Sequence, residues 1–132
     1  MSDVMAPHEL WDVHGPSLLA VARTLLGDES AAQRAVASAL TTFYQDHGSP
    51  EPIHALRGSA RYVFAHSEAI RSGSTLVSFE APGPLRRMAL NQRRMLALCT
   101  YGGHTYRDAA LLMGISADTA ARLLTTALKR RR

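Results

Sequence analysis

The chain has 132 residues, 20% of them charged, and a formal net charge of +4 at pH 7. A chain of this length holds one ordinary domain or two small ones. Its single cysteine, Cys99, excludes an intramolecular disulfide and a structural zinc site built on several thiols. No apolar run is long enough to cross a bilayer and no secretion signal precedes the first helix, so we expect a cytoplasmic protein without a membrane partner.

The charges are distributed unevenly along the chain. Residues 86–132 contain ten Lys and Arg against two Asp, a net charge of +8. Residues 1–85 contain five basic and nine acidic side chains, a net charge of −4. A basic segment displaces counterions from phosphates, so the second half of the chain is predicted to bind nucleic acid.

The chain opens with apolar residues at helical spacing over 10–26. Gly15 and Pro16 interrupt this pattern, and they either kink one helix or separate two. Asp28 is then placed to cap a second helix that runs from residue 29 to about residue 44.

A third helix is predicted from residue 53 or 54 to residue 70, although Gly58 in its interior weakens the pattern. Turn residues at both ends of 71–84 indicate a linker. The predicted organisation is therefore a helical domain over 1–70, a linker over 71–84 and a second helical domain over 85–132. No strand-like alternation competes with the helical patterns, so the fold class is all-α.

The last third of the chain has the pattern of a helix-turn-helix. Ala109 and Ala110 put small residues on one side of a short helix, and Gly114 supplies a tight turn. Ser116 is placed to cap a second helix over 117–128, which would be the reading helix. Paired helices of this kind also occur in bundles that bind nothing, and the basic charge favours DNA.

These residues resemble a known family. Residues 14–28 resemble the start of the core-binding domain of bacterial extracytoplasmic-function sigma factors, which belong to the sigma-70 family, and residues 90–132 resemble their promoter-binding domain. The strongest match consists of Thr105-Tyr106, Ala109-Ala110, Gly114-Ile115-Ser116, Thr119 and Ala127-Leu128. The resemblance implies a sigma-domain-2-like bundle that binds RNA polymerase and a sigma-domain-4-like helix-turn-helix that binds promoter DNA.

The chain departs from the family on its second helix. The family carries an Asp-x-x-Gln-Glu cluster there to contact the polymerase clamp, and this chain has Arg34, Ala37 and Ser38 at the corresponding positions. We expect these three residues to lie in a partner-binding surface. The change removes two acids and adds a positive charge, which opposes an ionic contact to the clamp.

The reading helix is poor in long basic side chains. Arg122 is its one strong candidate for a base or phosphate contact, although a solvated charge is an equal alternative. Lys129 and Arg130 are expected to contact phosphates rather than to read sequence. The complete predicted DNA-binding set is Arg107, Asp118, Thr119, Arg122, Lys129 and Arg130.

Other patterns favour no chemistry. The six histidines form no i, i+4 pair and share no ligand spacing with Cys99 or an acid, so no metal or cofactor is predicted. No Ser or Thr has a catalytic triad around it, and we expect no enzyme. Tyr62 and Phe64 either stack on unpaired bases or pack in the core, and packing is the preferred interpretation.

Two functions follow from these patterns. The first is a sigma-factor-like regulator that binds promoter DNA and contacts RNA polymerase. The second is a sigma mimic that binds an anti-sigma factor, or another polymerase regulator, without initiating transcription. A third arrangement, in which the first domain dimerises or binds another partner, stays open.

Overall fold

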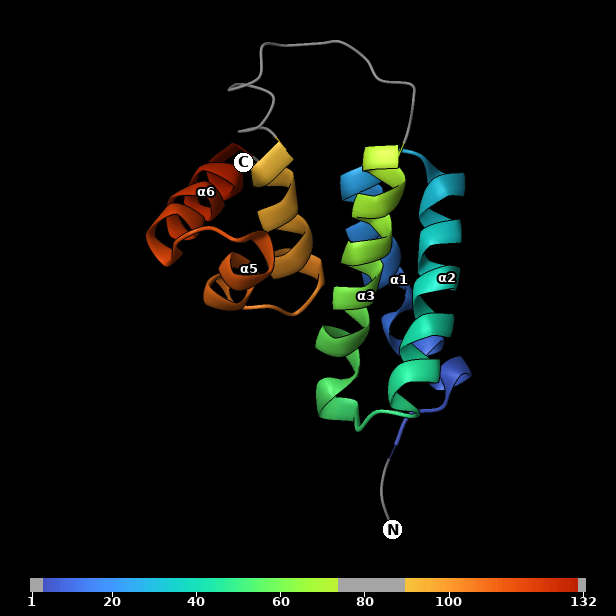
Figure 1. Cartoon of the computed structure of the whole chain (residues 1–132). Helices are drawn as coiled ribbons and strands as arrows, with labels where there is room; N and C mark the ends of the chain where they lie inside the picture. Colours follow the sequence, from blue (N-terminus) through green and yellow to red (C-terminus); the bar gives the residue numbers. More distant parts are fainter. Residues whose placement is uncertain (1–3, 74–89, 131–132) are drawn as a thin grey trace.

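The computed structural model describes residues 4–73 and 90–130, and every regular element in these ranges is a helix (Figure 1). The first range contains α1 (Pro7–Leu26), α2 (Glu29–His47) and α3 (Pro52–Gly73). The second is helical from residue 90 and continues as a π-helix, η1 (Leu96–Tyr101), before α5 (Tyr106–Met113) and α6 (Ala117–Arg130). The all-α prediction is confirmed for the described residues. None of their helices combines the length and apolar character that a bilayer crossing requires.

Helix α1 is a single helix that passes through Gly15 and Pro16 without ending. The indole ring of Trp11 lies against Gly15, where an added Cβ would approach the ring within 3.0 Å. The helix ends at Gly27, whose φ of 74° is the left-handed conformation that glycine adopts without strain. Of the two alternatives that the sequence left open, one helix is correct.

Helices α2 and α3 both extend beyond their predicted ends. The Asp28 carboxylate accepts a hydrogen bond of 2.7 Å from the Ala31 N–H, which confirms the predicted cap, and α2 continues to His47. Gly58 does not weaken α3, because the absent side chain makes room for the Phe43 ring; an added Cβ would lie 3.1 Å from that ring. Gly58, whose low helix propensity argues against a helix here, therefore allows α3 to pack closely against Phe43.

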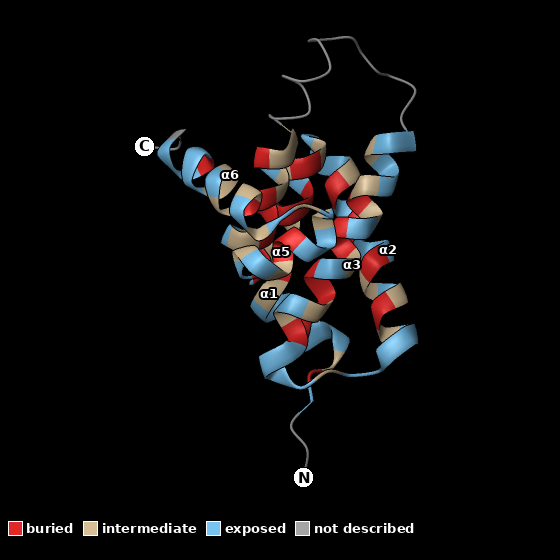
Figure 2. Ribbon diagram, turned by 60° about the vertical axis from the view of Figure 1, so that its left-hand side comes forward, coloured by how far each residue is buried: buried red, intermediate tan, exposed pale blue. Residues whose placement is uncertain are grey.

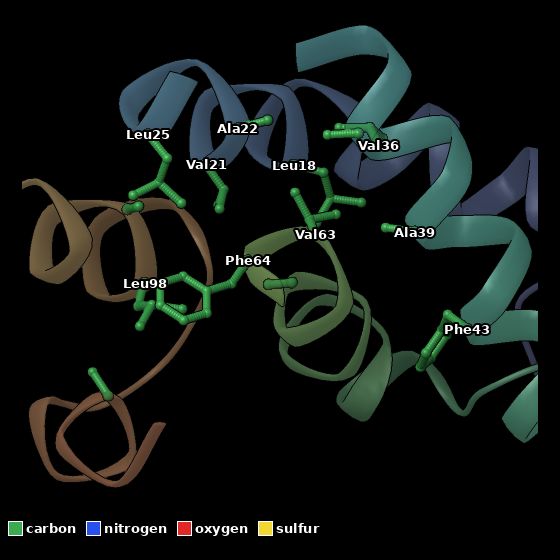
Figure 3. Packing of buried hydrophobic residues seen from close by; sticks show 14 of the residues in the cluster. Leu18, Val21, Ala22, Leu25, Val36, Ala39, Phe43, Val63, Phe64 and Leu98 are labelled. Atoms are coloured by element: carbon green, nitrogen blue, oxygen red, sulfur yellow. The ribbon is translucent and has the colours of Figure 1, made fainter. Parts of the chain in front are cut away.

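The three long helices form a bundle, which we call the N-terminal bundle (residues 4–73). Figure 3 shows its side chains meeting between the helices, with Phe64 of α3 directed toward Leu98 of η1. Burying each large aliphatic side chain contributes about 1.5–3 kcal/mol before the entropy of ordering it is counted. The large, fully buried aliphatic side chains of the bundle are Leu10, Leu18, Val21, Leu25, Val36 and Val63.

The remaining helices form the C-terminal lobe (residues 90–130), which packs on the bundle. Element η1 contacts α1 and α3, and one cluster of buried residues continues from the bundle into the lobe (Figure 2). Residues 71–73 of the predicted linker form the end of α3, and residues 74–89 lie outside the described residues. In this structure the two parts share a core, and their division into two domains remains a prediction.

Candidate nucleic-acid interface

Two side-chain caps and one glycine define helices α5 and α6 and the turn between them. The Thr105 hydroxyl oxygen accepts a hydrogen bond of 3.1 Å from the Asp108 N–H and caps α5. Helix α5 ends at Gly114, whose φ is 71°. The Ser116 hydroxyl oxygen then accepts from the Thr119 N–H at 3.1 Å and caps α6. The predicted glycine turn and serine cap are both confirmed.

Helix α6 has one face against the lobe. Ala120 and Ala127 are buried, and Leu123 and Leu124 are partly buried against the shared core. Helix α6 contacts α5 and η1 and, among the described helices, makes no contact with the N-terminal bundle. Its other face is therefore left for solvent or a ligand.

That other face carries a polar stripe, which we call the outer stripe of α6. It consists of Asp118, Arg122, Thr125 and Lys129, all exposed. Their spacing of i, i+4, i+7 and i+11 places them on one line along the helix. Beside the stripe lies a shallow hollow lined by Ala121, Arg122, Thr125 and Thr126.

The other predicted DNA-binding residues lie elsewhere. Thr119 is partly buried and its Oγ1 accepts a hydrogen bond of 2.9 Å from the Ser116 hydroxyl, so its side chain is part of the cap. Arg107 is exposed in the first turn of α5, with its guanidinium 5.2 Å from the centre of the Tyr106 ring. Arg130 is the last residue of α6.

The structure therefore brings Asp118, Arg122 and Lys129 together and leaves Arg107 and Thr119 outside their stripe. Thr125, which the sequence-based set lacks, belongs to the stripe. Helical periodicity counted from Arg122 would have found it.

Part of the basic charge of the lobe is neutralised by the bundle. Arg94 donates to the Glu68 carboxylate at 2.6 Å, and Arg71 donates to the same oxygen at 3.0 Å. Burial alone would raise the pKa of Glu68, but the hydrogen bonds and charges of the two arginines outweigh it, so the pKa is lowered. In a second ion pair, Arg57 lies 3.3 Å from Asp108. The exposed basic side chains that the structure describes in the lobe are Arg93, Arg107, Arg122 and Lys129.

The predicted partner-binding residues lie on the outer face of α2. Arg34, Ala37 and Ser38 are all exposed, and a guanidinium nitrogen of Arg34 donates to the Ser30 hydroxyl at 3.0 Å. Figure 1 places α2 and α6 on opposite sides of the molecule. The two predicted surfaces are therefore separate.

The aromatic candidates for base stacking are engaged within the protein. Phe64 is 9% exposed and faces η1, as packing requires. The Tyr62 hydroxyl donates to Asp46 at 2.7 Å and lies 2.9 Å from His47 Nε2, while its ring meets Phe43 edge-on at 5.4 Å between centroids. The packing interpretation is correct for Phe64.

Among the described residues, no group of three or more His, Cys, Asp or Glu is placed to hold a metal ion. Cys99 is partly buried, and burial raises the pKa of its thiol, which disfavours the reactive thiolate.

No protein family, curated protein or solved structure matches this chain. What the chain does is therefore inferred from its own residues.

Proposed function

We propose that this chain is a sigma-factor-like transcription regulator that binds promoter DNA through α5 and α6 and contacts RNA polymerase through the N-terminal bundle. The observation that carries the proposal is the outer stripe of α6, which presents Arg122 and Lys129 to solvent on the second helix of a helix-turn-helix. The major groove of DNA admits one such helix. The resemblance of residues 90–132 to promoter-binding domains of sigma factors supports the same assignment.

The stripe suggests a role for each side chain. Arg122 lies near the middle of α6, where an arginine reaches guanine or a phosphate; a bidentate guanine contact gives about 1–3 kcal/mol of discrimination. Lys129 lies in the last turns and contacts phosphate. Asp118 repels phosphate, so it suits the amino group of cytosine in the groove. Two basic groups on the stripe give few phosphate contacts, and we expect a shallow salt dependence.

The test is duplex DNA affinity measured against salt concentration for wild type, Arg122→Ala and a matched control, Arg34→Ala. Both variants remove one exposed arginine, but Arg34 lies on α2, on the opposite side of the molecule. We expect Arg122→Ala to weaken binding and reduce the salt slope by about one, and Arg34→Ala to leave both near wild type. Equal effects of the two variants, or no DNA binding by wild type, would contradict the proposal.

The second candidate function is a sigma mimic that occupies an anti-sigma factor. It is favoured by the α2 surface, where Arg34, Ala37 and Ser38 stand in place of the acidic cluster that grips polymerase in the family. Co-migration with core RNA polymerase and promoter-dependent transcription separate the two functions. Capture of an anti-sigma factor without polymerase binding supports the mimic. In that case, restoring the family pattern with Arg34→Asp, Ala37→Gln and Ser38→Glu should create polymerase binding.

A further inference from the structure

The lobe packs on the bundle mainly through η1 against α1, and it also meets α3 where the chain leaves η1. An added Cβ on Gly102 would lie 2.9 Å from the Leu98 carbonyl oxygen and 3.2 Å from the Ala60 side chain. Gly103, with a φ of 71°, would place a Cβ 3.0 Å from Leu56. The backbone of these glycines therefore rests directly on α3. We call this contact, together with the adjoining His104, the seam.

A buried histidine lies at the seam. His104 is 5% exposed, and its Nδ1 lies 2.9 Å from the Gly102 carbonyl oxygen. A carbonyl oxygen only accepts, so Nδ1 carries the proton in this contact and Nε2 of the neutral ring does not. Nε2 is buried and has no hydrogen-bond partner among the described residues. The seam thus suits the neutral ring.

Among the described residues, the charged groups that act on this ring lie on α3 and α5. Burial lowers the pKa of His104, and the charges of Arg61 and Arg57 lower it further. The Gly102 contact and the charge of Asp108 act in the opposite direction and do not compensate. Asp108 also forms an ion pair with Arg57, at 3.3 Å.

We propose that the seam is an acid-sensitive switch: the segment from Gly102 to His104 is closed on α3 while His104 is neutral, and protonation of Nε2 opens it. A proton on Nε2 creates a buried charge with no acceptor, close to two arginines. Leaving the seam returns the ring to water, where the charge is solvated. Opening the seam frees the start of the segment that leads to α5 from α3, while η1 stays packed on α1.

The direction of the pH dependence follows from proton linkage. In the open state the ring has its ordinary pKa of 6.5, and in the closed state the pKa is lower. Above 6.5 both states are neutral and closure is at full strength. As the pH falls from 6.5 through the lowered value, the open state binds the proton first and closure weakens, by about tenfold for each unit between the two pKa values.

Hydrogen exchange followed by NMR tests this switch in the intact chain. The reporters are the Gly102 and His104 amides, which donate to Ala97 and Leu98 carbonyl oxygens at 3.0 Å. As the pH falls from about 7 to about 5, we expect their protection factors to fall relative to amides inside α1 and α3. The fall should be absent in His104→Gln, which keeps an N–H donor but does not titrate.

The matched control is His14→Gln. His14 is another histidine whose pKa is lowered by burial, but it lies in α1, and the fall should persist in this variant. Unchanged seam protection in wild type, or an equal fall in His104→Gln, would overturn the proposal. If His104→Gln does not fold, the NMR titration of the His104 ring in the wild type is compared with the loss of seam protection. The two must occur over the same pH range, and different ranges would refute the switch. The experiment uses no DNA, so its outcome is independent of the proposed function.

Discussion

Glu68 holds the C-terminal lobe to α3 through charge, and replacing it with glutamine measures that contribution. Its carboxylate accepts from Arg94 at 2.6 Å and from Arg71 at 3.0 Å, and the side chains of Glu68 and Arg94 are only 21% and 20% exposed. Glu68→Gln keeps the shape and removes the charge. Hydrogen bonds to charged groups contribute about 1.5–3 kcal/mol each in net terms, and a poorly solvated arginine is left behind. We expect a loss of about 2–3 kcal/mol in the free energy of unfolding.

The loss depends on pH in a definite direction. The pKa of Glu68 is lowered from its ordinary 4.5, so the stabilisation by the carboxylate is fully present above 4.5 and disappears as the pH falls through the lowered value. The glutamine variant lacks this titration. Urea denaturation followed by far-ultraviolet circular dichroism should therefore show a gap between wild type and variant that is constant near neutral pH and closes in acid.

Glu29→Gln is the matched control. The Arg23–Glu29 pair is as short, at 2.7 Å, but its side chains are 47% and 53% exposed. Exposed pairs of this kind contribute about 0.2–1 kcal/mol. Equal losses in the two variants, or a Glu68→Gln loss that is the same at every pH, would refute the argument that burial makes the Glu68 contact strong.

Two further predictions concern the bundle and the turn. Leu18→Ala removes a fully buried side chain between the long helices, and we expect it to cost about 2–5 kcal/mol in chemical denaturation. Gly114→Ala meets no atom within 4 Å but must adopt a φ of 71°; we expect a loss of about 1–2 kcal/mol in thermal or chemical denaturation. A neutral Gly114→Ala would show that the α5–α6 turn does not require this backbone conformation.

The sequence predicts helices well where local chemistry marks their ends. Asp28 and Ser116 accept backbone N–H groups where their positions predict caps, and Gly27 and Gly114 adopt positive φ where a helix stops. Each of these signals acts within a few residues. The role of Gly58 could not be predicted, because its contact with Phe43 joins two helices and no local pattern contains it.

The contacts between the lobe and α3 could not be predicted, because they join distant parts of the chain. Arg94 and Glu68 are 26 positions apart and carry no mark of pairing in the sequence. Glu68 thus takes Arg94 away from the basic groups that could meet a phosphate, while Arg57 pairs with the acid Asp108, so the two contacts leave the net charge of the second half unchanged. The outer stripe of α6, in contrast, could have been predicted from the sequence. The spacing from Asp118 to Lys129 places its residues on one side of the helix, opposite the side that packs on the lobe.

The docked arrangement determines how two partners share this molecule. The face of α2 that carries Arg34 and the outer stripe of α6 lie on opposite sides, and none of the described helices of the lobe contacts α2 (Figure 1). Two separate partners can therefore occupy the two faces at once. Among the described helices, α2 connects to α6 through α1 or α3 and then η1, because these are the elements in contact. The seam at His104 lies on the α3 side of that route, so its protonation alters the α3 connection and leaves the α1 connection in place.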